Sequence, residues 1–176
     1  MAAYRSSPLK FVVASLIAGL TLAMATGTAA ASTPVLMWAG AKRLNIMCNV
    51  AGSPGVDHLA LTKKLCDDVL RIARKGAPVP VATIAIGDPD VLAADAVTLL
   101  VHASVTTRGR ERLMAFSIRP HRTTAADATV LFGAPPRVAP LSPSSDSSPA
   151  LHSALAAALS ETLPWLVRPS NPQRIR

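Results

Sequence analysis

Residues 43–75 read RLNIMCNVAGSPGVDHLALTKKLCDDVLRIARK, and this stretch decides the fold. Every second residue of its first part is apolar: Leu44, Ile46, Cys48 and Val50. Such a period of two is typical of a strand with one apolar face. We therefore predict a strand over residues 43–51.

The second part of the same stretch predicts an amphipathic helix. Gly52-Ser53-Pro54-Gly55 breaks the chain, Asp57 is placed to cap the helix, and Gly76 ends it. At about 100° per residue, one half of the helix carries the apolar side chains together with Thr62. These residues are Leu59, Leu61, Thr62, Leu65, Cys66, Val69, Leu70, Ile72 and Ala73. The charged residues occupy the other half, so we interpret the charge run as a solvated face.

Further strands are expected on both sides of glycine-containing turns. Residues 79–86 predict a strand in which Pro80 lies near the start or at a sheet edge. Two more strands, at about 96–106 and 110–119, are separated by a tight turn at Arg108-Gly109. Residues 127–133 predict a last short strand.

The pairing of the two long strands can be chosen by burial. A loop at Arg108-Gly109 would place Leu99 opposite Ile118 and Val101 opposite Phe116, which gathers the apolar side chains on one face. The other face would be open to water, and it carries Thr98, His102, Ser104, Ser117 and Arg119.

A proline- and serine-rich linker is expected over residues 134–147, followed by a second helix. Ser148 is placed as its N-cap and Pro149 as its first residue, while Pro164 ends it. The buried stripe of this helix consists of Leu151, Ala154, Leu155, Ala158, Leu159, Thr162 and Leu163. The remaining residues, 168–176, predict a disordered basic tail.

This order of elements predicts an α/β fold, a two-layer sandwich with a small mixed sheet of about five strands and two helices on one face. Residues 32–167 are then a single domain. Many unrelated functions occur on such folds, so no activity follows from the architecture.

The N-terminal 31 residues have the pattern of a secretory signal peptide. Arg5 and Lys10 precede an apolar run, Phe11–Ala25, that is shorter than the roughly 20 residues needed to cross a bilayer. We expect cleavage after Ala31 and an exported product, periplasmic or secreted, with no membrane span; an uncleaved anchor is the alternative. Removing this segment takes away two of the 18 basic residues and none of the 10 acidic ones, which leaves a net charge of +6.

A basic exported protein can attract anionic partners, although a solvated basic surface explains the same composition. The aromatic content narrows the choice of partner. Stacking on bases or sugars needs several exposed rings. The mature chain has only Trp38, Phe116, Phe132 and Trp165, which argues against a nucleic-acid or carbohydrate platform that binds by stacking.

The only two cysteines, Cys48 and Cys66, fall on surfaces that should face each other. In an oxidising compartment they are candidates for a disulfide that closes a loop of about 18 residues. Two buried free thiols are the equally weighted alternative. The spacing of a redox-active Cys-x-x-Cys pair is absent.

The sequence contains few candidates for catalytic or metal-binding residues, and it implies no cofactor. The four histidines lack the spacing of a metal site, and Asp88-Pro89-Asp90 is better explained as a turn. His102 and Ser104 share a strand face, and Asp95 or Glu111 would have to orient the imidazole for nucleophilic catalysis. Side chains two apart on a strand are separated by roughly 6.5 Å, so we interpret the pair as polar residues on a solvated sheet face.

Three arginines, Arg108, Arg110 and Arg112, cluster at the predicted hairpin tip, and alternation would put them on one side. They either dock an acidic polymer or keep the hairpin soluble. The sequence thus leads to a non-enzymatic envelope domain that binds a protein or an anionic component through the sheet face and this tip. Arg119 and His102 complete the candidate binding residues, and a small hydrolase using His102 and Ser104 is the alternative.

Overall fold

The computed structural model describes residues 37–52, 57–109, 111–123, 133–141 and 148–166. The strands are β1 (Arg43–Gly52), β2 (Val81–Thr83), β3 (Ala96–Arg108), β4 (Glu111–His121) and β5 (Ala134–Leu141). The helices are α1 (His58–Ala73) and α2 (Pro149–Thr162), with short 3₁₀ helices η2 (Pro89–Leu92) and η4 (Pro164–Leu166). The predicted signal peptide, most of the predicted strand 127–133 and the predicted tail 168–176 lie outside these residues.

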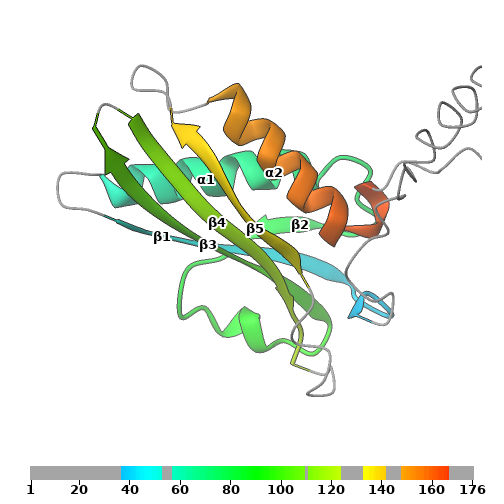
Figure 1. The fold of residues 1–176 in the computed structure, drawn as a ribbon. Helices are drawn as coiled ribbons and strands as arrows, with labels where there is room; N and C mark the ends of the chain where they lie inside the picture. Colours follow the sequence, from blue (N-terminus) through cyan, green and yellow to red (C-terminus); the bar gives the residue numbers. More distant parts are fainter. Residues whose placement is uncertain (1–36, 53–56, 110, 124–132, 142–147, 167–176) are drawn as a thin grey trace, which may run out of the picture.

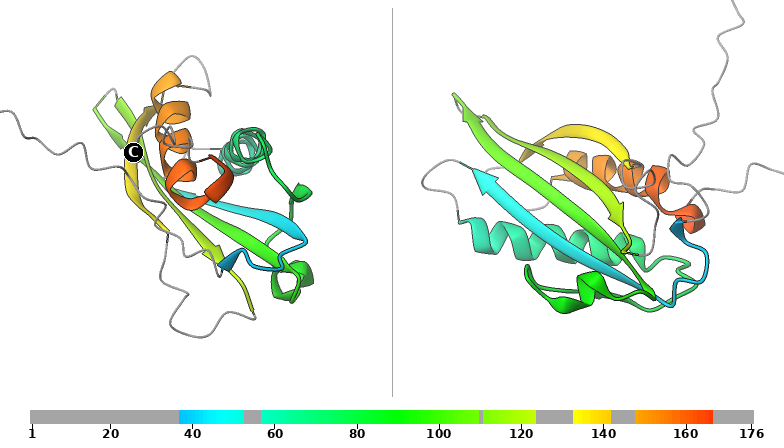
Figure 2. Two further views of the ribbon diagram at one scale, coloured as in Figure 1. Left: turned by 90° about the vertical axis from the view of Figure 1, so that its right-hand side faces the viewer. Right: turned by 90° about the horizontal axis from the view of Figure 1, so that it is seen from below.

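One five-stranded sheet in the order β2-β1-β3-β4-β5 forms one layer, and both helices cover the same face of it (Figures 1 and 2). Strand β1 runs parallel to β2 and β3, while β4 is antiparallel to β3 and β5. The predicted two-layer α/β architecture is therefore confirmed. The crossover through α1 passes over one face of the sheet and the connection containing η2 passes over the other (Figure 1).

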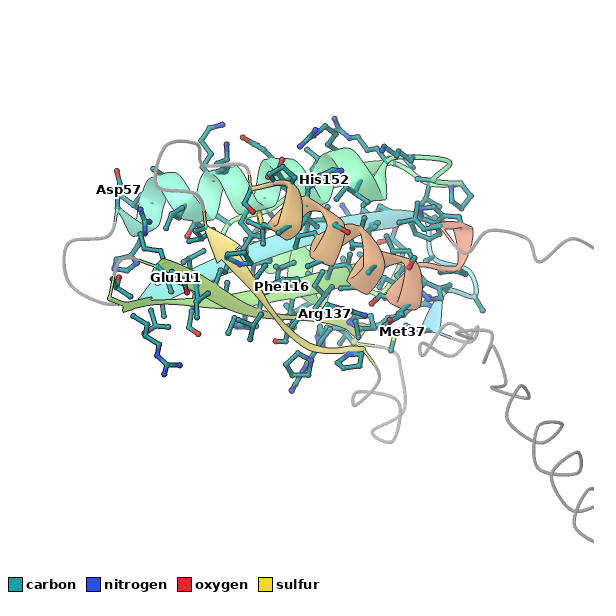
Figure 3. The ribbon with its side chains drawn as sticks, turned by 45° about the horizontal axis from the view of Figure 1, so that its top comes forward. Met37, Asp57, Glu111, Phe116, Arg137 and His152 are labelled. Carbon is teal, nitrogen blue, oxygen red and sulfur yellow. A yellow bond between two sulfur atoms is a disulfide. The ribbon has the colours of Figure 1, made fainter. Side chains whose placement is uncertain are left out.

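Alternation within the strands assigns the core to the helix-covered face. Leu44 and Ile46 of β1 and Leu99 and Val101 of β3 are fully buried beneath the helices. Side chains from both layers fill the space between sheet and helices, as Figure 3 shows around Phe116. The larger fully buried side chains from the helices and the loops that adjoin them are Met37, Leu65, Val69, Leu155, Leu159 and Leu163.

Both helices begin where capping chemistry predicts. The Asp57 carboxylate accepts a hydrogen bond from the Ala60 N–H at 3.0 Å. The Ser148 hydroxyl accepts one from the Leu151 N–H at 3.4 Å, with Pro149 in the first turn. Each cap satisfies a backbone donor that has no partner within its helix. The sequence therefore predicts the start of each helix to within one residue.

The β3–β4 hairpin differs from the predicted register by two residues. Arg108 pairs with Glu111, and Gly109, which follows β3, has a φ of +62°. Val101 therefore lies opposite Ile118, not opposite Phe116. Because a shift of two keeps every side chain on its own face, burial alone cannot distinguish the two registers.

The predicted linker over residues 134–147 is wrong in its first eight residues, which form β5. Pro135, Pro136 and Pro140 are compatible with a strand here because β5 is at the sheet edge and pairs only with β4. A proline lacks the N–H that a central strand must donate. Alternating burial of Ala139 and Leu141 is the remaining strand signal, and residues 142–147 lie outside the described part of the chain.

The predicted strand over residues 79–86 is also shorter in the structure. Only Val81–Thr83 is paired as β2, against Leu44–Ile46 of β1. The last bond of this ladder runs from the Ile84 N–H to the Ile46 carbonyl, at 2.9 Å. Beyond it the chain turns away from β1 toward η2.

Cys48 and Cys66 form a disulfide, with their Cα atoms 5.8 Å apart. Cys48 lies on the helix-facing side of β1 and Cys66 on the side of α1 that faces the sheet. The alternative of two free thiols is therefore wrong. A structural disulfide is typical of proteins that fold in an oxidising compartment, which supports export.

Candidate binding surface

The face of the sheet away from the helices is divided into a covered and an open half. The η2 segment covers the half near the start of β1. There Arg43 forms ion pairs with Asp90 at 3.0 Å and Asp95 at 3.3 Å, and Asn45 donates to the Asp90 carbonyl. Thr98 is 0% exposed beneath this cover. The prediction that Thr98 faces water is wrong, because the sequence pattern of one strand does not reveal what a later connection covers.

The other half of this face is left without a covering element among the described residues. We call it the open face and define it by Asn49, His102, Ser104, Ser117 and Arg119. Asn49 and Ser117 are the register partners of His102 on either side, so the three side chains form a polar row across β1, β3 and β4. The predicted exposure of His102, Ser104 and Arg119 is confirmed, and Ser117 is half-buried.

The open face is basic. Arg119 is exposed, and Arg108 is exposed at the hairpin end of the same face. Neither arginine forms an ion pair with another described residue. Glu111, opposite Arg108, is the one acidic residue in the described strands. This surface therefore offers uncompensated positive charge beside neutral hydrogen-bonding side chains.

The three arginines of the predicted tip do not act as one cluster. Register places Arg108 opposite Glu111 and Arg112 opposite Thr107, so Arg108 and Arg112 project from opposite faces of the sheet. Arg110 lies outside the described residues. The prediction that all three share one side is wrong for Arg108 and Arg112, because the turn between them breaks the simple alternation of an extended segment.

His102 and Ser104 lie two residues apart on β3, about 6.5 Å along the strand. No hydrogen bond joins them in the described part of the chain. Neither predicted carboxylate lies near His102. Asp95 forms an ion pair with Arg43. Glu111 pairs with Arg108, which lies six residues, or roughly 20 Å, beyond His102 along β3. The arrangement can therefore donate and accept hydrogen bonds, but neither Asp95 nor Glu111 is placed to orient the imidazole.

The aromatic residues lie away from the open face. Trp38 and Trp165 pack edge to face with their ring centroids 5.3 Å apart, and the Trp165 indole N–H donates to the Ala73 carbonyl. Phe116 is buried in the core, and Phe132 lies outside the described residues. The described open face thus offers no ring on which a base or a sugar could stack.

Within residues 37–166, as far as they are described, no three histidine, cysteine or acidic side chains are grouped as metal ligands. None of the described helices has the length and apolar character needed to cross a bilayer.

Comparison with known proteins gives a distant structural likeness only. No family model matches the sequence, and no curated protein matches it. Among solved structures, a leucine-to-methionine variant of the PelC dodecamer from Paraburkholderia phytofirmans and the PelC dodecamer itself are similar, each with 11% sequence identity over 70% of this chain. The TM-scores are 0.42 and 0.40, and the matches cover 88% and 90% of the solved chains. A likeness at this level carries no conclusion about function.

The cover formed by η2 and the ion pairs of Arg43 were not predicted from the sequence. The signal was present as Asp88-Pro89-Asp90, which correctly predicts a turn: Asp88 accepts from the Asp90 N–H at 2.9 Å. Nothing in the local pattern, however, shows that this turn packs on β1, 45 residues earlier.

Proposed function

We propose that this chain is an exported, non-enzymatic binding domain of the cell envelope, periplasmic or secreted. Its open face would hold a protein or an anionic envelope component. The Cys48–Cys66 disulfide supports an oxidising compartment, in agreement with the signal peptide predicted over residues 1–31.

The observation that carries the proposal is that Arg119, exposed on the open face, forms no ion pair with another described residue. Arg119 projects next to the row formed by Asn49, His102 and Ser117, and none of the described strands brings an acid near it. Since charge that is not neutralised within the protein attracts anions at long range, this face favours a negatively charged partner. The absence of exposed rings on the described face argues against recognition by base stacking.

A charge reversal tests this proposal. Arg119→Glu is expected to weaken binding to an immobilised polyuronate by about tenfold at low salt, which corresponds to about 1.4 kcal/mol. The matched control is Lys75→Glu, which makes the same change in net charge at an exposed position beyond α1. Retention of both variants and the wild type is measured on one column at low and at high salt.

The two variants should separate if the open face is the binding surface. Binding by the wild type and by Lys75→Glu is expected to fall together as salt screens the interaction. Equal weakening by the two substitutions would show that only net charge matters. No retention of the wild type, even at low salt, would rule out a polyuronate partner for this face.

A further inference from the structure

Among the described residues, one edge of β1 has a pairing partner only near its start. Strand β3 pairs with all ten residues of β1, whereas β2 pairs only with Leu44–Ile46 on the other side. The backbone groups of Leu44 and Ile46 point toward β2, since the Leu44 N–H donates to the Pro80 carbonyl and Ile46 accepts from Ile84. By alternation, Cys48 and Val50 direct their N–H and C=O groups to this same edge.

These edge groups have no backbone partner within the described part of the chain. The hydrogen-bond ladder would next join the Cys48 N–H to the Ile84 carbonyl, yet that bond is not formed. The chain has already turned away at this point toward η2. A strand position therefore lies vacant beside residues 48–52 of β1, in direct continuation of β2.

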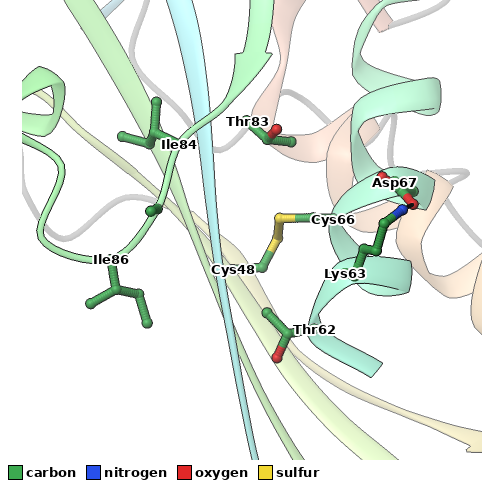
Figure 4. Close-up of a pocket in the computed structure, with 9 residues that line it drawn as sticks. Cys48, Thr62, Lys63, Cys66, Asp67, Thr83, Ile84 and Ile86 are labelled. Atoms are coloured by element: carbon green, nitrogen blue, oxygen red, sulfur yellow. Dashed lines mark hydrogen bonds and ion pairs between the residues drawn. A yellow bond between two sulfur atoms is a disulfide. The ribbon is translucent and has the colours of Figure 1, made fainter. Parts of the chain in front are cut away.

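A hollow of about 390 Å³ opens at the vacant position (Figure 4). Its size falls in the range of ligand pockets, roughly 300–1,000 Å³. The disulfide lies between its two walls, α1 with Thr62 on one side and the segment containing Ile84 and Ile86 on the other. Ile86 is 65% exposed, which leaves apolar surface available at the rim.

The charges of this hollow are already compensated. Lys63 and Asp67 on the α1 wall form an ion pair at 2.7 Å. The hollow therefore carries no net charge for a ligand to balance and suits an uncharged, apolar side chain. The opposite edge of the sheet differs, because Pro135, Pro136 and Pro140 of β5 cannot donate to an added strand.

We propose that an extended polypeptide segment adds to the sheet beside Cys48–Gly52, running in the position that β2 leaves vacant. Its backbone pairs with the edge groups of Cys48 and Val50, and one uncharged apolar side chain enters the hollow between α1 and Ile86. This is strand addition, in which backbone hydrogen bonds provide affinity and a side-chain pocket provides specificity. It uses a different surface from the open face, so the two proposals stand or fall separately.

Amide hydrogen exchange tests the vacant edge in the disulfide-bonded protein. The amides of Cys48 and Val50 are expected to exchange at least about tenfold faster than those of Met47 and Asn49, which alternation directs to β3. Equal protection of all four amides, without any peptide present, would show that the edge is already occupied and would overturn the proposal. Sedimentation of the same sample identifies a second copy of the chain as the cause if one is bound.

Peptide binding tests the occupant. The probes are blocked pentapeptides Ser-Thr-X-Thr-Ser with valine, leucine or phenylalanine at X. At least one is expected to slow exchange at Cys48 and Val50 about tenfold or more, and the same peptide with N-methylated amides should have no effect because it cannot donate backbone hydrogen bonds. No protection by any of the three peptides would refute the proposal.

Variants of the hollow complete the test. Thr62→Tyr fills the hollow and is expected to weaken peptide binding about tenfold, while Ala60→Tyr places the same side chain on the same helix at an exposed position outside it. Ile86→Ser on the opposite wall should weaken binding too and serves if Thr62→Tyr fails to fold. Unchanged binding by a folded hollow variant would contradict the proposed side-chain pocket.

Discussion

Replacing both Cys48 and Cys66 with serine is expected to lower the free energy of unfolding by about 3 kcal/mol. The disulfide joins residues 18 positions apart and therefore restricts the unfolded chain, which loses less entropy on folding. The bond also ties α1 directly to β1, with Cys48 buried in the core and Cys66 partly buried against it. The loss should appear as a lower midpoint of urea unfolding, followed by circular dichroism.

Reduction of the wild type provides the matched control for this double substitution. The reduced protein should unfold at nearly the same urea concentration as the variant, and added reductant should leave the variant unchanged. A double variant as stable as the oxidised wild type would mean that the disulfide does not contribute to folding, and the inference of an oxidising compartment would lose its main structural support.

Leu155→Ala is expected to cost about 2–5 kcal/mol of stability. Leu155 is 0% exposed at the centre of the face that α2 packs on the sheet, so truncation removes buried methyl groups and leaves a cavity. Leu92→Ala is the matched control: the same atoms are removed from a side chain that is 63% exposed, and the change should stay within about 0.5 kcal/mol.

Urea unfolding of both leucine variants measures this difference. A cost for Leu155→Ala close to that of Leu92→Ala would show that α2 does not pack on the sheet as described. Such a result would question the two-layer architecture itself, because α2 covers the part of the sheet that contains β4 and β5 (Figure 1).

The elements that sequence analysis predicts well are those specified by neighbouring residues. The charged and apolar halves of residues 58–73 and the cap at Asp57 predict α1 without any knowledge of the remaining chain. Two side chains depart from this division, because Asp68 of the charged half is buried and Leu59 of the apolar half is 85% exposed. Ser148, Pro149 and Pro164 define α2 in the same way. For β1, strict alternation is sufficient, because one face is buried and the other is polar.

The predictions fail where contacts between distant parts of the chain determine register, pairing or burial. The hairpin register differs by two residues because both registers bury the same face. Strand β5 is missed because its prolines resemble those of a linker, and they are tolerated only through its place at the sheet edge. Thr98 is covered by η2, whose packing on β1 no local pattern reveals.

The candidate site was predictable in part, because alternation within single strands assigns side chains to a face. Period-two alternation is enough to place His102, Ser104 and Arg119 on one face, and the structure confirms that they are exposed. The vacant edge beside Cys48 was not predictable, since it results from the departure of the chain after Ile84. Sequence periodicity gives the face of a side chain but not the length over which two strands stay paired.

The most direct test of the binding surface is an amide chemical-shift map of the isotopically labelled, oxidised domain, titrated with a soluble oligouronate at low salt. We expect the largest shifts to cluster on β3 and β4 around His102, Ser117 and Arg119 and to disappear at high salt. Shifts that concentrate instead on α1, around Lys63 and Lys64, would contradict it.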